Sequence, residues 1–177
     1  KEEIEDQGVN LDSIDRVANM LEKSLSERSG LFTAAYQSNN PDAREIQAQL
    51  KSDEAAVEII RVGPSINNEL SYLAIIIQPD DLKQVLISDG AGLEHEKFKL
   101  YRNLIKFKRH DSQSYGNYWQ PVDELLGQIE KIYLSLDGVY NQICLSSLAI
   151  DEKTYLSDHR HYTVLPSLRD LTRATKA

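Results

Sequence analysis

One segment constrains the fold more than any other, the run Leu70-Ser71-Tyr72-Leu73-Ala74-Ile75-Ile76-Ile77-Gln78. It has the length of a strand, and its apolar residues are continuous rather than alternating. This pattern is typical of a strand that is buried on both faces, so other elements must cover both sides of its sheet. Shorter strand patterns lie at residues 55–62 and 84–87, with turn residues at 63–68 and 79–81 between them. The sequence therefore predicts an antiparallel meander.

Helical patterns surround this meander. Apolar residues recur at helical spacing from Leu11 to Leu25, and a second helix follows Asn39-Asn40-Pro41, where Asn-Pro turns the chain. The later elements are helices at about 93–108 and around Trp119, short strands at 131–135, 154–156 and 161–165, and a last helix capped by Ser167. The sequence predicts an α/β fold: a helical lead-in over residues 1–50, an antiparallel β meander, and then alternating helix and strand.

The charge balance argues against two classes of partner. The formal net charge is −8 and the pI is about 5.0, which disfavour both a general nucleic-acid binder and an anionic membrane surface. The basic run Lys106 to His110 is interpreted as the cationic last turn of a helix. No apolar run approaches the ~20 residues of a membrane span. Cys144 is the single cysteine, which fits a reducing compartment, so we expect a cytoplasmic protein.

The amino terminus is charged, begins at Lys1 rather than Met, and has no signal-peptide core. We therefore expect the chain to be cut from a longer protein.

Residues with catalytic chemistry form no convincing pair. Cys144 lies between Ile143 and Leu145, which predicts burial in the core. His159 and His161 would share one face of a strand and could bind a metal, but no second pair of ligands is evident. No glycine loop of the phosphate-binding kind is present. We therefore predict neither a metal nor a cofactor.

Three stretches occur in an informative order. The first is residues 50–61, a helix end followed by a strand. The second runs from Tyr118-Trp119 through Leu126-Gly127 to Ile132-Tyr133-Leu134-Ser135-Leu136-Asp137-Gly138-Val139-Tyr140-Asn141-Gln142-Ile143. The third runs from Tyr155-Leu156-Ser157-Asp158 to Pro166-Ser167-Leu168-Arg169-Asp170-Leu171. Together they resemble the CHAT family, the caspase-like domain that often follows tetratricopeptide or other helical repeats. The second stretch is similar to the family's Trp-Pro helix, first main strand and Ser-Pro-Asp-Gly turn, with Leu136 where Pro is common.

The resemblance implies that residues 51–177 are the amino-terminal part of a caspase-like cysteine peptidase domain, with an incomplete sheet. Family members place their His and Cys dyad after the next strands, beyond Ala177. No catalytic residue is therefore assigned in this chain, and whether it is an enzyme stays open. The chain would supply scaffold strands and part of a substrate groove, for which Asp137, Gly138 and Asn141 are the candidates. The partner would be the carboxyl-terminal half of the domain or a second polypeptide, and a helical-repeat partner is possible.

Two other hypotheses remain open. The chain could be a stand-alone, non-enzymatic interaction module that uses the helices of residues 11–50 to dock a partner. It could also be an unrelated small-molecule enzyme that uses Cys144, which a thiol titration would decide.

Overall fold

The computed structural model describes residue 20 and residues 41–63 and 69–173. The chain divides into two compact units, Lys1–Asn40 and Pro41–Ala177, and the description below concerns the second. The predicted helix between Leu11 and Leu25 lies outside the described residues, apart from Met20.

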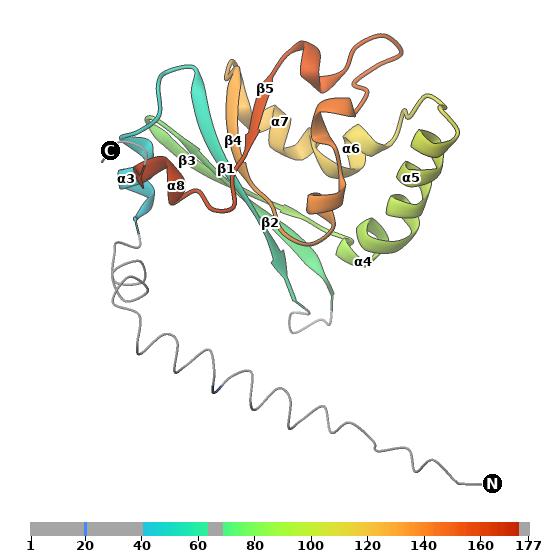
Figure 1. Ribbon diagram of the computed structural model, residues 1–177, viewed down its shortest axis with the longest axis horizontal. Helices are drawn as coiled ribbons and strands as arrows, with labels where there is room; N and C mark the ends of the chain where they lie inside the picture. The colour runs from blue at the N-terminus through green and yellow to red at the C-terminus, as the bar shows by residue number, and fades with distance from the viewer. Residues whose placement is uncertain (1–19, 21–40, 64–68, 174–177) are drawn as a thin grey trace, which may run out of the picture. The chain divides into compact units, whose positions relative to one another are not determined.

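A five-stranded mixed sheet forms the centre of this unit, in the order β3-β2-β1-β4-β5 (Figure 1). The strands are β1 (Glu54–Val62), β2 (Ser71–Gln78), β3 (Asp81–Ile87), β4 (Lys131–Ser135) and β5 (His161–Val164). The pairs β1–β2 and β2–β3 are antiparallel, whereas β4 is parallel to β1 and β5 is parallel to β4. The predicted α/β fold with its antiparallel meander is therefore confirmed.

Helices and single turns fill the connections. They are α3 (Ala43–Gln47), α4 (Gly90–Gly92), the π-helical turn η1 (Leu93–Lys97), α5 (Phe98–Lys106), α6 (Ser114–Tyr118), α7 (Gln120–Leu126), the 3₁₀ turns η2 (Gly138–Gln142), η3 (Leu145–Ser147) and η4 (Leu156–Asp158), and α8 (Asp170–Arg173). The helix predicted around Trp119 is divided into α6 and α7, and Pro121 lies in the first turn of α7. The last helix begins at Asp170, later than the predicted cap at Ser167.

The strand predicted at residues 154–156 is wrong. Leu156 begins the turn η4, and Tyr155 makes only an isolated bridge to Ala149. The Asp158 carboxylate accepts a hydrogen bond of 2.8 Å from the Tyr155 backbone N–H. This local side-chain bond closes a turn in place of a strand ladder.

The larger core lies between one face of the sheet and the helices α5 to α7. Tyr72, Ala74 and Ile76 of β2 point into it, together with the fully buried Trp119 and Tyr140. Aromatic rings fill its centre, with the Tyr72 and Tyr140 ring centroids 5.0 Å apart in an edge-to-face arrangement.

The smaller core covers part of the opposite face. Ile46, Leu50 and Leu168 pack against Ala56 and Ile77. β2 is thus covered on both faces at Ile77, whereas Leu73 and Ile75 on the same face are only partly buried, so the predicted burial of both faces holds for part of the strand. The capping box of Asp42 and Glu45 starts α3. Since α3 packs on the sheet, the compact unit begins at Pro41, whereas the predicted lead-in extended to residue 50.

Candidate functional site at the ends of β1 and β4

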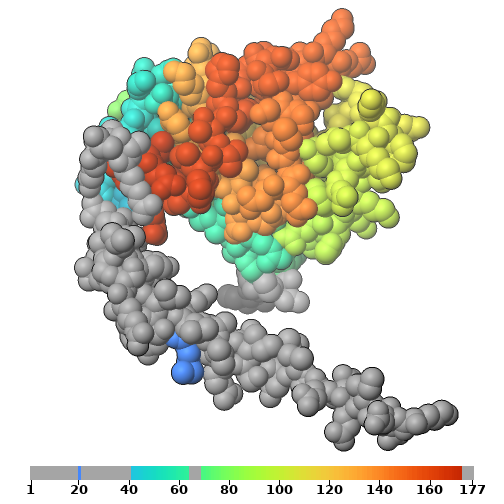
Figure 2. All heavy atoms as spheres, viewed as in Figure 1, coloured from blue at the N-terminus to red at the C-terminus, as the bar shows by residue number. Residues whose placement is uncertain are grey.

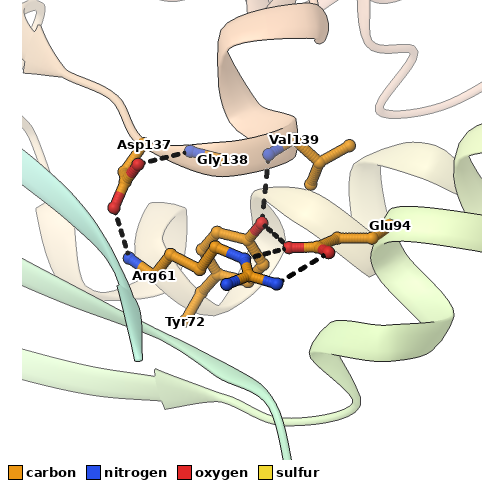
Figure 3. Close-up of polar contacts among 6 residues, drawn as sticks. All are labelled: Arg61, Tyr72, Glu94, Asp137, Gly138 and Val139. Carbon is orange, nitrogen blue, oxygen red and sulfur yellow. Dashed lines mark hydrogen bonds and ion pairs between the residues drawn. The ribbon is translucent and has the colours of Figure 1, made fainter. Parts of the chain in front are cut away.

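A tight turn follows β4 and is fixed to the end of β1. The Asp137 carboxylate accepts hydrogen bonds from the Gly138 backbone N–H at 2.7 Å and from the Arg61 backbone N–H at 3.0 Å (Figure 3). Gly138 has a φ of +55°, in the left-handed region that favours glycine. A Cβ atom at this position would also collide with the Tyr72 hydroxyl. Both the backbone and the available space therefore require glycine.

The hydroxyl of Tyr72 links this turn to η1. It donates a hydrogen bond of 2.6 Å to the Glu94 carboxylate and accepts one of 3.0 Å from the Val139 backbone N–H. Burial, and then the hydrogen bond to Glu94, raises the pKa of Tyr72 to about 12. The hydroxyl therefore stays protonated at neutral pH and continues to donate to Glu94.

Arg61 completes the network with a forked ion pair. Its Nε and Nη2 atoms lie 2.5 Å and 3.1 Å from the two carboxylate oxygens of Glu94. The Arg61 guanidinium, above all through this hydrogen bond, lowers the pKa of Glu94. Glu94 belongs to a π-helical turn, a distortion that is frequent at functional sites. We call the segment Asp137–Val139, with Arg61, Tyr72 and Glu94, the anchored turn.

Two connected hollows lie beside the anchored turn. The nearer, of about 370 Å³, is lined by Arg61, Glu94, His95, Phe98, Gly138, Val139 and Gln142. The larger, of about 950 Å³, shares Glu94, His95, Phe98 and Gln142 with it and extends along α5. Its further lining residues are Glu96, Lys99, Tyr101, Arg102, Asn103, Ile105 and Lys106. We call this larger hollow the α5 groove.

The three candidate groove residues have different positions. Gly138 lines the nearer hollow. Asp137 is directed at the Arg61 backbone, and the Asn141 side-chain amide donates a hydrogen bond of 3.2 Å to the Leu136 carbonyl. The last two thus stabilise the turn. Arg61, Tyr72 and Glu94 were missed by the sequence reasoning, since each lies in a different segment and carries no local motif.

Cys144 is exposed, so its predicted burial is wrong. Ile143 and Leu145 are the buried residues here, and the intervening backbone is extended (φ −81°, ψ 91°). Alternation along an extended chain therefore turns Cys144 outward. In the part of the chain that the structure describes, no hydrogen bond joins Cys144 to a histidine, and His159 and His161 are both exposed.

The described residues, 20, 41–63 and 69–173, contain no candidate metal centre. No group of three or more His, Cys, Asp or Glu side chains in this part of the chain could hold a metal ion. None of the described helices is long and apolar enough to cross a membrane.

Comparisons with known proteins give no relative: no family model, no curated protein and no solved structure matches this chain.

Proposed function

We propose that residues 51–177 are the amino-terminal, non-catalytic portion of a CHAT-type, caspase-like cysteine peptidase domain. The observation that supports this most is the anchored turn. It places Asp137-Gly138 at the carboxyl end of β4, beside the parallel strand β1. In open α/β sheets, sites form in crevices outside the carboxyl ends of parallel strands. The chain would contribute scaffold strands and, at Gly138, part of a substrate groove.

The exposed strand β5 is where the missing portion of such a domain would add. β5 pairs on one side only among the described residues, and Val164 is 62% exposed. A further strand pairing there would extend the parallel order β1-β4-β5. That portion would carry the His that deprotonates a Cys thiol for attack on a peptide carbonyl.

Intact mass spectrometry of the natural gene product, with whatever co-purifies, tests this proposal first. A longer chain, or a second polypeptide that carries a His and a Cys, supports it. A lone product that ends near Ala177 contradicts it.

In a longer product, peptidase activity gives the sharper test. Gly138→Ala should reduce the rate by at least about tenfold, because it displaces the anchored turn. Gly63→Ala is the matched control, since a Cβ atom at Gly63 meets nothing within 4 Å.

A second candidate function is a stand-alone interaction module. The larger core favours it, because it covers one face of the sheet and requires no further polypeptide there. This hypothesis expects a product without a His and Cys portion and without peptidase activity. The mass measurement therefore separates the two functions.

A further inference from the structure

Three cations of α5 line the α5 groove without a carboxylate partner among the described residues. The side chains of Lys51, Arg61, Lys83, Lys97, Lys131 and Arg160 lie within ion-pair distance of carboxylates. Among the described residues, in contrast, no carboxylate pairs with Lys99, Arg102 or Lys106, and all three line the α5 groove. The whole chain has a net charge of −8, so the positive charge of these three side chains is opposite in sign to that of the chain as a whole. Such a patch attracts an acidic partner.

The helix dipole does not account for this patch. A cation is favoured in the last turn of a helix, which explains Lys106. Lys99 and Arg102 lie earlier in α5 and receive less from the dipole. The interpretation of Lys106 to His110 as the cationic end of a helix therefore explains only part of the positive charge along the groove.

Apolar side chains lie between these cations. Ile105 is 52% exposed, and Phe98 stacks on Tyr101 with ring centroids 6.3 Å apart. The Arg102 guanidinium lies 5.7 Å from the centroid of the Phe98 ring, which orders its charge over the floor of the groove. His95, Phe98, Arg102 and Ile105 follow each other at intervals of three and four residues, so they share one face of the helix. In Figure 2, α5 lies at the outer surface in yellow-green, next to the orange segment that includes η2.

We propose that the α5 groove binds an acidic peptide segment of a partner protein, with apolar side chains on Phe98 and Ile105 and carboxylates on Lys99, Arg102 and Lys106. An exposed apolar strip flanked by cations matches an amphipathic acidic segment, which is a recognised mode of peptide docking. The Ile105 side chain is half exposed between the cations, which favours a peptide with apolar side chains over the phosphate backbone of a nucleic acid. This inference does not rest on the peptidase proposal.

The test is fluorescence anisotropy with a labelled peptide of Leu and Glu, the Leu at helical spacing, titrated with the full chain at low ionic strength. We expect saturable binding with a Kd below about 1 mM. Two peptides serve as controls, one with Lys in place of every Glu and one with Ser in place of every Leu, and both should bind at least about tenfold more weakly. A labelled oligo-dT tests whether the groove binds a nucleic acid instead.

Paired variants make the test specific for the groove. Arg102→Glu with Lys106→Glu should weaken binding at least about tenfold, which corresponds to about 1.4 kcal/mol. The matched control is Lys153→Glu with Arg169→Glu, exposed residues away from the groove whose reversal changes the net charge equally. Ile105→Ser removes the apolar contact and should also weaken binding; since Ile105 is 52% exposed, we expect the fold to remain intact.

Three results would overturn the proposal. The first is no saturable binding of the Leu-Glu peptide. The second is equal weakening by the two charge reversals, because binding would then follow net charge alone. The third is tighter binding of oligo-dT than of the peptide, which would make the patch a nucleic-acid site.

Discussion

Replacing Gly138 with Ala tests how firmly the anchored turn is built. Two costs follow from the structure. A non-glycine residue at a φ of +55° costs about 1–2 kcal/mol. The new Cβ atom displaces the Tyr72 hydroxyl, and the Val139 N–H then loses its acceptor, which costs about 1–3 kcal/mol. The free energy of unfolding should therefore fall by about 2–5 kcal/mol.

Urea denaturation followed by tryptophan fluorescence measures this change. Trp119 is the only tryptophan and is fully buried, so its emission reports loss of the larger core. With a slope of about 2 kcal/mol/M for a unit of this size, the midpoint should fall by about 1–2.5 M. Gly63→Ala is the control and should change the free energy of unfolding by less than about 0.5 kcal/mol, because nothing lies near its Cβ position.

A double-mutant cycle then identifies the cause. Tyr72→Phe removes the hydroxyl that the new methyl group strikes, although the ring carbons Cε1 and Cζ stay 3.0 Å from the Cβ position. The Gly138→Ala cost should therefore be at least about 1 kcal/mol smaller in the Tyr72→Phe background. Equal costs in both backgrounds, or a Gly138→Ala cost no larger than that of Gly63→Ala, would refute the argument.

Three further predictions concern the rest of the described unit. Ile46→Ala should lower the free energy of unfolding by about 2–4 kcal/mol in the same urea assay, because Ile46 is 7% exposed in the smaller core; a change below about 0.5 kcal/mol would mean that α3 is not part of the folded unit. The Glu94 carboxyl has a lowered pKa in the folded state. Its contribution to the free energy of unfolding is therefore fully present above the unfolded pKa near 4.5 and is lost as the pH falls through the folded pKa. Glu94→Gln should therefore destabilise the chain at pH 7 and make its stability fall less steeply with acid, and identical pH profiles would contradict this. Cys144 is exposed, so a thiol reagent should label it in the native chain at a rate within about tenfold of the unfolded chain; strong protection would show that the thiol is covered.

The sequence was informative about the fold where burial produces a pattern in consecutive residues. The run in β2 predicted cover on both faces; Ala74 and Ile76 are buried on one face, and on the other Ile77 is buried but Leu73 and Ile75 only partly. The same reasoning failed at Cys144, because its two apolar neighbours are the residues that point inward. It also failed at residues 154–156, where the Asp158 carboxylate closes a turn. Local side-chain hydrogen bonds leave no periodic signal.

Only one part of the candidate site could be predicted. Asp137-Gly138 is a turn signal of two adjacent residues, so the sequence located it. Its contacts are long-range: 76 positions separate Asp137 from Arg61, and 67 separate Val139 from Tyr72. A single sequence contains no signal that joins such positions, since the sheet order β2-β1-β4 brings them together.

Glu94 belongs to both proposed sites, and this shared position decides which variants separate them. Its carboxylate holds Arg61 and Tyr72 in the anchored turn, and it also lines one end of the α5 groove. A Glu94 variant would therefore disturb both the anchored turn and the α5 groove. Its effect could not show which of the two proposed sites is responsible. Gly138 does not line the α5 groove, and Arg102 makes no contact in the anchored turn. If a longer natural product has peptidase activity, loss of that activity in Gly138→Ala with intact peptide binding, and the reverse in Arg102→Glu, would show that the two sites act independently.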